Sequence, residues 1–596
     1  MKKVTTLPGE WYCVTAAAGT TVTASPDGGE PVTLLTMEEA GQASFLAIDN
    51  EIVISDDAAI VLPTDAPAAV VSGGGITAKE QTFIKGLMGT IGTITDEQFT
   101  AMYAGRADGR IYGTRIPRGS YSTLPAVSDA SKVRYGASVG LRWQPATDPG
   151  VDDFAGLLIN DWQHANGYYD EHGDPRITAF EGSPAFDRDK LTFTVYAPFW
   201  WYYGPDFDEP EKYWLLLKTD TNPNDERFHI WPSCRRYDGS IAPYGAHAAF
   251  PAAFGKDGKL TSAAGLKPLR DCSYTNVVDM FKQLGRGYGG CNAHVQGFIA
   301  FETMFKSGTK DVQSILAGCT NYYTSYNSAA TLAYPDTFFP VTEAQAALID
   351  IGNAASIGTS TDRQNVNCHL YADNARVIGK EVIYTDDGAS VAYVKILLDP
   401  AEVTPFVAKN GVYFTTMWCY TGETNAVIGH FDGSMTSNTN GRHPFRIRGT
   451  EVAGGTNIVF CDIVCDNHTN CSNDVLVALD CPPSTDPATI RATYTNVGTI
   501  PALGSNAQAW VLDVAIDPVS GAMYPTAWAS NGNSGFRSGW WSGNATAELR
   551  QFAAGWGHAS NAATGGAGSA SASYVLAYSH AFRGSRVGGA RSGGES

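Results

Sequence analysis

Short runs of Thr, Val and Ile separated by turn residues dominate the first 75 positions of the chain, and the cluster Ser25–Gly29 is one such turn. Runs rich in β-branched residues between Gly, Pro, Asp and Ser clusters are typical of strands. The pattern therefore predicts a small all-β module over residues 1–75. Such a module would suit an attachment role.

Helical spacing follows the break at Ser72–Gly75. Thr77 and Glu80 stand at the two positions of a capping box, and the apolar residues over 83–88 recur at helical intervals, so a helix is expected to begin near Thr77. A second short helix is predicted over Asp96–Tyr103, before a connector near 105–130 that is rich in Gly, Arg and Pro. Residues 76–130 are thus expected to be a helical and loop linker.

Two further helices are predicted from apolar stripes in the middle of the chain. The first stripe lies within residues 277–284 and the second within residues 295–305. Gly285–Gly290 separates the stripes and resembles a glycine loop, but it follows a helix rather than a strand, so it is interpreted as a turn. Upstream, Leu191–Tyr196 reads as a strand, and the aromatic run Phe199–Tyr203 after it is expected to serve core and interface packing.

Strand-like runs return over residues 331–420, of which Val391–Leu398 is the longest. This stretch is interpreted as an inserted β-region. It would separate residues 131–330 from residues 421–596, which are expected to be two parts of one domain.

The end of the chain has a composition of its own. From about residue 525 it is dominated by Gly, Ala, Ser, Asn and aromatic residues, with no Lys after Lys409 and no carboxylate side chain between Glu548 and Glu595. The large aromatic residues are too many for a solvated linker. The segment is therefore expected to fold back onto the preceding domain.

Composition places these elements in a fold class. Of 596 residues, 43% are hydrophobic and 17% charged, with 64 Gly. The hydrophobic fraction is that of a folded chain, and the length predicts three or four units. The small share of charge and the abundance of Gly favour strands, turns and ordered loops over long helices. We expect an α+β, β-rich protein.

Charge and hydropathy restrict the partners. A net charge of −19 disfavours nucleic acid as a partner of the whole chain. No apolar run approaches the length of a membrane helix, so no membrane insertion is expected. Met1–Lys3 is followed by polar residues, Pro8 and Glu10 rather than an apolar stretch, which predicts no signal peptide and synthesis in a host cytoplasm.

Cysteine and carboxylate clusters offer alternative chemistry. The eleven Cys are interpreted mainly as reduced, buried thiols. A zinc site is an alternative for the group around His468, but its spacing lacks two paired knuckles; the group is Cys461, Cys465, Cys471 and Cys481. The acidic run Asp206, Asp208, Glu209 and Glu211 suggests a glycosidase pair or a Ca²⁺ site. Because Pro205 and Pro210 flank it, an exposed acidic turn is preferred, and no cofactor is predicted.

Three groups of passages carry a family resemblance. They are Lys132–Ser138 with Asp152–Leu157; Thr421–Asn425, Asp432–Ser434 and 437–439 with Pro444–Glu451; and Gly539–Ala545 with Gly584–Val587. In this order they resemble the tail-fibre proteins of phages that infect gut bacteria. Many of those proteins resemble the variable proteins of diversity-generating retroelements, including the phage major tropism determinant. The matches span about residues 130–596, and Val452–Gly455 departs from the usual N-P-x-G.

The resemblance implies a C-type-lectin-like domain related to the formylglycine-generating enzyme, with the β-rich region as its insertion. Pro444–Glu451 would hold its R-G-x-E element, Gly539–Ala545 its G-G-x-W-x-x-G element and Gly584–Arg586 its closing G-x-R. Because no Cys follows Cys481, the thiol pair of the oxidases is missing, so the fold is expected to bind rather than catalyse.

The implied protein is a virion tail receptor-binding protein, an adhesin for a host-cell surface receptor of protein or glycan nature. It would form a homotrimer and attach to other virion tail proteins through its N-terminal module. Two alternatives remain: a virion-associated carbohydrate-processing enzyme with the same aromatic surface, and an adhesin encoded by a bacterium or prophage remnant. Measurable turnover would identify the enzyme, and the genome neighbourhood would identify the adhesin of a bacterium or prophage remnant.

A variable region over about residues 525–590 needs fixed positions that carry the backbone and exposed positions that face the ligand. The expected fixed positions are Gly539, Gly543, Leu549, Gly584 and Val587. Aromatic rings and Arg dominate binding hot spots, so they are the main candidates for receptor contact. The candidates are Trp540, Trp541, Asn544, Arg550, Phe552, Trp556, His558, Tyr574, Tyr578, His580, Phe582 and Arg583. Plain core packing is the alternative for each, Trp541 above all.

Sequencing can test the variable region directly. Across a population of the source phage or bacterium, we expect substitutions in the codons for residues 525–596 to cluster at adenine-containing positions, with a near-identical template repeat in the flanking DNA. A uniform sequence without a template would contradict diversification.

Overall fold

The structure is a computed structural model, and it describes most of the chain. The described residues are 2–5, 11–16, 20–24, 32–36, 41–46, 51–55, 60–64, 93–119, 133–144, 151–311, 318–319, 322–388, 390–426, 444–452, 454–530, 535–536, 538–555 and 568–590. The chain divides into two units, Met1–Gly73 and Gly74–Ser596, and each is described by itself. Its α+β, β-rich class is as predicted.

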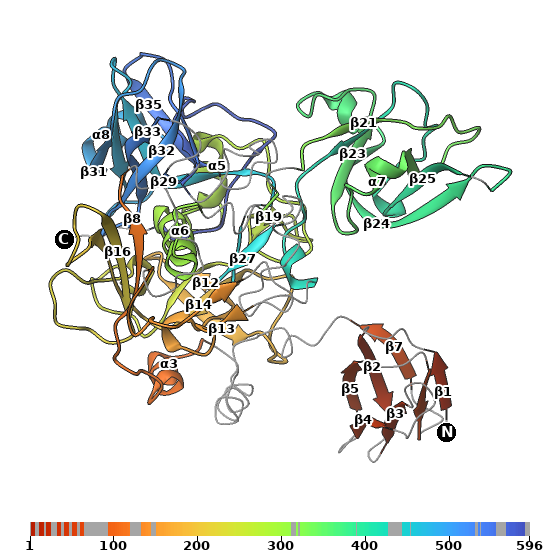
Figure 1. Ribbon diagram of the computed structural model, residues 1–596, viewed down its shortest axis with the longest axis horizontal. Coiled ribbons are helices and arrows are strands. Elements are labelled where there is room, and N and C mark those ends of the chain that lie inside the picture. The colour runs from red at the N-terminus through yellow and green to blue at the C-terminus, as the bar shows by residue number, and fades with distance from the viewer. Residues whose placement is uncertain are drawn as a thin grey trace. The chain divides into compact units, whose positions relative to one another are not determined.

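The first unit is built from strands, as its β-branched runs predict. One sheet has the order β1-β6-β3-β4, and the other has the order β5-β2-β7 (Figure 1). All pairings within them are antiparallel. The bounds are β1 (Lys2–Thr5), β2 (Trp11–Ala16), β3 (Thr21–Ala24), β4 (Val32–Thr36), β5 (Gly41–Leu46), β6 (Glu51–Ile54) and β7 (Ile60–Thr64).

The short helix predicted before the connector is confirmed as α3 (Asp96–Tyr103). Thr95 caps it, and Gln98 completes the capping box. Phe99 is buried, and its ring lies 4.0 Å from that of Tyr244 between centroids, which fixes the helix to the body. The helix predicted near Thr77 lies outside the described residues.

Three sheets form the body of the second unit (Figure 1). The first has the order β17-β15-β16-β8-β9: β17 (His229–Ile230), β15 (Trp200–Pro205), β16 (Tyr213–Thr219), β8 (Tyr112–Pro117) and β9 (Arg134–Gly136). The second has the order β13-β12-β14-β18: β13 (Pro175–Phe180), β12 (Gln163–Tyr169), β14 (Thr192–Tyr196) and β18 (Gly245–Ala248). The strand predicted at Leu191–Tyr196 is therefore confirmed. Phe199 and Trp201 are buried in the core, as expected for the aromatic run.

The third, here called the C-terminal sheet, has the order β31-β30-β29-β35-β36-β34-β32-β33, with β37 beside β29. Its strands are β31 (Thr495–Ile500), β30 (Asn473–Val477), β29 (Asn457–Asn467), β35 (Glu548–Ala554), β36 (Ala570–Ser571), β34 (Gly539–Trp541), β32 (Gln508–Ile516), β33 (Met523–Ala529) and β37 (Arg583–Gly584); α8 (Pro487–Thr493) lies between β30 and β31. Because β34 to β37 pair within this sheet, the end of the chain folds back onto the domain, as predicted.

The insertion forms a sheet of its own, shown in green in Figure 1. Its order is β21-β26-β23-β24-β25-β22: β21 (Ser325–Asn327), β26 (Tyr413–Thr416), β23 (Ala354–Gly358), β24 (Ala372–Tyr384), β25 (Val391–Leu398) and β22 (Phe338–Val341), with α7 (Glu343–Ala346) packed on it. A separate hydrophobic cluster fills it. We call Ser325–Thr416 the insert. Smaller ladders join β10 (Trp143–Gln144) to β11 (Val151–Asp152), β19 (Ala253–Phe254) to β20 (Leu260–Thr261) and β27 (Phe445–Ile447) to β28 (Thr450–Val452).

The two predicted middle helices are confirmed as α5 (Tyr274–Lys282) and α6 (Ala293–Ser307), with a turn between them. The prediction of one buried apolar stripe is too narrow for α6, because nearly every residue of the helix is buried. The helix packs against strands of both the C-terminal sheet and the sheet that holds β8 and β16. Buried polar side chains on it therefore need partners.

Those partners are charged groups from distant parts of the chain. Glu302 accepts from Lys218 Nζ at 2.5 Å and from Arg448 Nη1 at 2.9 Å, and all three side chains are fully buried. One turn later, Lys306 Nζ lies 2.5 Å from Asp152 Oδ2, also buried. Burial alone would raise the pKa of Glu302, but the two cations hold that pKa below its ordinary value. The carboxylate is therefore ionised in the core.

The family-like motifs also lie inside the structure. The Glu451 carboxylate accepts from the backbone N–H of Gly422 at 2.9 Å and from the Thr424 hydroxyl at 2.6 Å. Arg586 is 1% exposed and donates to the backbone carbonyls of Ala249, at 3.0 Å, and Glu451. The R-G-x-E and G-x-R residues are thus joined by one buried hydrogen bond, which secures the chain's last strands to β28.

Removing the charge of Glu302 tests the buried cluster. Glu302→Gln leaves Lys218 and Arg448 without a counter-charge, and breaking such a pair costs about 3–5 kcal/mol of unfolding free energy. We expect a clear fall in the urea midpoint followed by tryptophan fluorescence. The matched control, Glu343→Gln at an exposed position of α7, should stay within about 0.5 kcal/mol of the wild type. Equal stability of the two variants would contradict the role given to Glu302.

Candidate functional site

The structure divides the predicted receptor-contact residues into core and surface. Five of them are buried: Trp540 (0% exposed), Phe552 (0%), Arg550 (2%), Arg583 (3%) and Phe582 (6%). Their predicted surface position is wrong, because the rings of Trp540 on β34 and Phe552 on β35 pack in the core, 5.8 Å apart, and Phe582 packs in a separate buried cluster. Asn544 is exposed, and Trp541, Tyr578 and His580 are half-buried. Trp556 and His558 lie outside the described residues.

The expected fixed positions lie where a scaffold needs them. Leu549 is 5% exposed and Val587 is 2% exposed. Gly543 packs directly against the Arg550 guanidinium, and Gly539 packs against the ring of Trp541, so a Cβ at either position would collide. Gly584 lies against the backbone of Leu269. Close approach, rather than flexibility, accounts for these glycines.

Four rings whose exposure falls along the chain form a row over residues 574–582. We call Tyr574, Tyr578, His580 and Phe582 the aromatic row. Tyr574 and Tyr578 stack at 4.1 Å between centroids with planes 10° apart, and Tyr574 is 38% exposed. The ring of His580 follows at 6.2 Å from Tyr578 and 5.2 Å from Phe582. The row runs from an exposed end at Tyr574 to a buried end at Phe582.

Two buried polar side chains on β35 hold the backbone of the row. Gln551 is 1% exposed, and its Nε2 donates to the carbonyls of Val575 at 2.9 Å and Tyr578 at 2.7 Å. Arg550 Nη1 donates to the Ser573 carbonyl at 2.6 Å. Sequence reasoning missed Gln551 and placed Arg550 on the surface; a polar pair within the apolar run of β35 was the available signal.

Arg583 lies beneath the exposed end of the row. Its guanidinium carbon is 4.5 Å from the centroid of Tyr574 and 5.6 Å from that of Tyr578, which is a cation–π geometry. Burial lowers the pKa of Arg583 to about 10. The side chain is therefore charged at neutral pH, and it orders the two rings while the outer edge of Tyr574 faces solvent.

His580 connects the row to the insert. Its Nδ1 accepts the backbone N–H of Phe582 at 3.3 Å, and its Nε2 lies 2.9 Å from the side-chain amide of Gln364. Burial and the nearby Arg583 charge lower the pKa of His580, against the opposing effect of Asp271 and Asp362. The ring is therefore held neutral at neutral pH.

Aromatic residues at the base of the insert pack against the buried end of the aromatic row. The ring of Tyr323 lies 5.5 Å from Phe582, and the guanidinium of Arg363 lies 3.7 Å above Tyr323. Trp418 meets Phe582 edge to face at 5.8 Å. Tyr323 is 42% exposed. Sequence reasoning missed these residues, since they lie more than 150 positions before the row and no motif links them.

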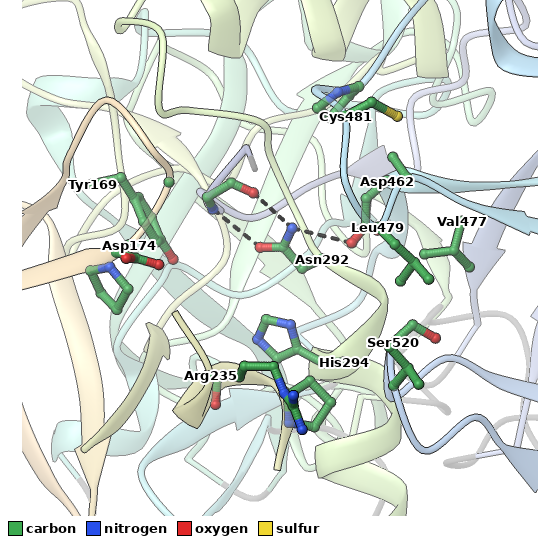
Figure 2. A pocket seen from close by; sticks show the side chains of 18 of the residues that line it. Tyr169, Asp174, Arg235, Asn292, His294, Asp462, Val477, Leu479, Cys481 and Ser520 are labelled. Carbon is green, nitrogen blue, oxygen red and sulfur yellow. Dashed lines mark hydrogen bonds between the residues drawn. The ribbon is translucent and has the colours of Figure 1, made fainter. Parts of the chain in front are cut away.

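A second candidate is a polar pocket that Figure 2 shows from close by. Two carboxylates, a guanidinium and an imidazole line it: Asp174, Asp462, Arg235 and His294. Asn292 donates to Asp462 Oδ2 at 3.2 Å and to the Gly589 carbonyl at 2.9 Å, so its amide secures the chain's end. No predicted receptor-contact residue is among the pocket residues that the structure describes.

The acidic run has a structural partner. Asp206 is 1% exposed, so the prediction of an exposed turn is wrong for it, although Asp208 and Glu211 are exposed. The Asp206 carboxylate accepts from Arg115 Nε at 2.6 Å and from two backbone N–H groups. Burial would raise the pKa of Asp206, but Arg115 and those N–H groups lower it. The cluster therefore joins β8 to the β15–β16 connection.

The cysteines near His468 are separated by their strand. Cys461 lies in the hydrophobic cluster that contains Val459, whereas Cys465 lies in the cluster that contains Phe460. Burial raises the pKa of Cys461 to about 12, which keeps it a thiol. His468 instead contacts Asp474 at 3.0 Å. In the part of the chain that the structure describes, no three potential ligands gather.

Comparison with known proteins adds no family: no family model matches the chain, and no curated protein matches it. Within the described residues, no helix is long and apolar enough to cross a membrane. The assignment of the aromatic row therefore depends on its geometry. Accessible ring surface and phenol hydroxyls together suit recognition, since aromatic rings give a large contact area for little conformational entropy.

Titration of His580 gives a pH signature for the site. A histidine whose folded-state pKa lies below its ordinary value of 6.5 stabilises the fold above that pH, and this contribution is lost as the pH falls below 6.5 and through the folded-state pKa. We expect the unfolding midpoint to fall more steeply from about pH 7 to about pH 5 in the wild type than in His580→Gln. Parallel pH curves for the two proteins would contradict the neutral ring.

Proposed function

We propose that the chain is a receptor-binding protein of a phage tail and that the exposed end of the aromatic row is part of its contact surface for a host-cell receptor. One observation carries the proposal: the accessible rings of Tyr574 and Tyr578 lie on a short segment whose backbone is held by buried side chains of the neighbouring strand β35. Arg550 and Gln551 hold the backbone there through main-chain carbonyls. Main-chain hydrogen bonds are insensitive to the side chains at the held positions.

This arrangement suits a surface whose residues change while the fold stays. Exchanging the side chain at Tyr574 alters what the row offers but leaves the Gln551 N–H bond to the Tyr574 carbonyl, 3.0 Å long, in place. The far end of the segment is secured independently by Arg586. A C-terminal binding surface, diversified or fixed, can therefore be built on this scaffold.

The C-type-lectin-like fold is part of the proposal. It is supported by the two helices α5 and α6 packed on β29, by the insertion between the two parts of the domain, and by the buried joint between Glu451 and Arg586. A homotrimer would present several rows at once and raise avidity over the single contact. The N-terminal strands would then attach the chain to other tail proteins.

Cell adsorption tests the proposal. The full-length chain, labelled with a fluorophore, is incubated with a panel of gut bacterial strains, and the half-saturating concentration is read by flow cytometry. We expect saturable adsorption to some strains and a rise of about 30-fold in that concentration for Tyr574→Ala, since a hot spot contributes at least about 2 kcal/mol. Thermal stability should stay near the wild type, because Tyr574 lies at the exposed end.

The matched control is Tyr168→Ala, which removes a tyrosine of similar exposure, 42%, from β12. It should adsorb as the wild type does. Equal losses in both variants, or no adsorption to any strain, would contradict the proposal. Release of reducing sugar from the cells by the wild type would favour the carbohydrate-processing enzyme instead.

A further inference from the structure

Two cysteines face each other where the chain enters and leaves the insert. Cys319 precedes β21, and Cys419 follows β26. Their Sγ atoms lie 3.4 Å apart although the residues are 100 positions apart in the chain. Cys319 is 1% exposed and Cys419 is 2% exposed. The two thiols therefore form one buried pair at the base of the insert.

The backbone around the pair is held on both sides. The Cys419 N–H donates to the Gly454 carbonyl at 2.9 Å, which secures this cysteine to the body beside β29. The Tyr322 N–H donates to the Cys319 carbonyl at 3.3 Å. Neither sulfur has to travel far to meet the other.

Other thiols contact different atoms. Cys461 Sγ lies 3.8 Å from the Ser585 hydroxyl, and Cys481 Sγ lies 3.6 Å from the Thr493 hydroxyl. Sulfur facing sulfur, as at Cys319 and Cys419, is the arrangement from which a disulfide forms by a small movement, because the covalent bond is about 2 Å long.

The pair also borders the aromatic row. Met417 and Trp418, just before Cys419, pack in one buried cluster with Ala581 and Phe582. A covalent bond at the base of the insert would therefore restrain the segment against which the buried end of the row rests. The restraint would act where the insert meets the proposed contact surface.

We propose that Cys319 and Cys419 are an oxidation site that closes a reversible disulfide across the base of the insert when the protein meets a small hydroperoxide. One thiolate attacks a peroxide oxygen, breaks the O–O bond and becomes a sulfenic acid, releasing hydroxide. The second thiol attacks that sulfur, the S–S bond forms, and water leaves. Overall, two thiols and one H2O2 give one disulfide and two H2O, so the sulfurs are oxidised and the peroxide is reduced.

A small oxidant suits the burial of the pair. The contact with Cys319, and burial, raise the pKa of Cys419 well above its ordinary value, so the thiol form dominates at neutral pH. Since the thiolate is the nucleophile, oxidation should be slow near neutrality and faster at alkaline pH. A chain made in a reducing cytoplasm would keep both thiols, and release into an oxidising medium would allow closure.

Peptide mapping tests the proposal on the full-length protein. The reduced chain is treated with H2O2, free thiols are alkylated, and the tryptic digest is analysed without reductant. We expect a cross-linked peptide joining Cys319 to Cys419, with a mass two hydrogens lower than the sum of the two peptides. The amount of this peptide should increase faster at higher pH, and the peptide should disappear after treatment with dithiothreitol. Amide exchange in β21 and β26 should slow in the cross-linked form.

Cys319→Ser and Cys419→Ser should each abolish this peptide. The control Cys465→Ser removes a buried thiol on β29, far from the pair in the sequence, and should leave the peptide unchanged. Because the main readout uses the wild type, a variant that fails to fold does not decide the outcome. Loss of both thiols to sulfinic or sulfonic acids without a cross-link, or linkage of either cysteine to another, would overturn the proposal. Neither result depends on host binding.

Discussion

Buried charge along one helix determines how the body of this protein is assembled. Glu302 and Lys306 lie one turn apart on α6, Lys310 follows just after its end, and each is neutralised by a group from a different segment. An unpaired charge in the interior costs several kcal/mol, so each partner must arrive for the fold to close. The partners lie on β16, on β11, in the turn between β27 and β28, and on β32: Lys218, Asp152, Arg448 and Asp513. Such pairs specify an arrangement more than they stabilise it, and here they align two sheets on one helix.

The placement of the C-terminal segment follows from that alignment. Arg448 enters the ionic cluster in a strained left-handed conformation, with φ at 44°, and the next turn brings Glu451 beneath Arg586. Arg586 then fixes the chain a few residues after the aromatic row, while Gln551 fixes it within the row. The accessible rings are therefore supported by two sets of buried polar contacts, one on β35 and one that leads through Arg586 and Arg448 back to α6. A change in exposed ring chemistry does not disturb that set, whereas a change in Arg448 or Arg586 would.

Periodicity predicted the helices and long strands well, because local spacing is enough to identify α3, α5, α6 and β25. It could not assign the faces of α6, since the partners of Glu302 lie 84 and 146 positions away. Nor could it separate core from surface in the C-terminal strands. Gly, Ala and Ser fill both faces there, so no alternation distinguishes Trp540 in the core from Tyr574 at the exposed end of the row. Residue type alone favours a surface position for aromatic rings and Arg at a binding site. This criterion is wrong for Arg550, Arg583 and Phe552, which are buried.

The insert is linked to the body by two kinds of contact that respond differently to conditions. Arg270 forms a bidentate pair with Asp373 at 2.7 and 2.6 Å, and Lys267 lies 3.2 Å from Glu402. These side chains are partly exposed, so each pair contributes at most about 1 kcal/mol and weakens as salt screens it. The apolar contacts of Trp418 with Phe582 are buried and do not respond to salt. Hydrophobic packing at the base of the insert therefore dominates over the ion pairs in setting where the insert lies against the aromatic row, and the ion pairs refine its orientation.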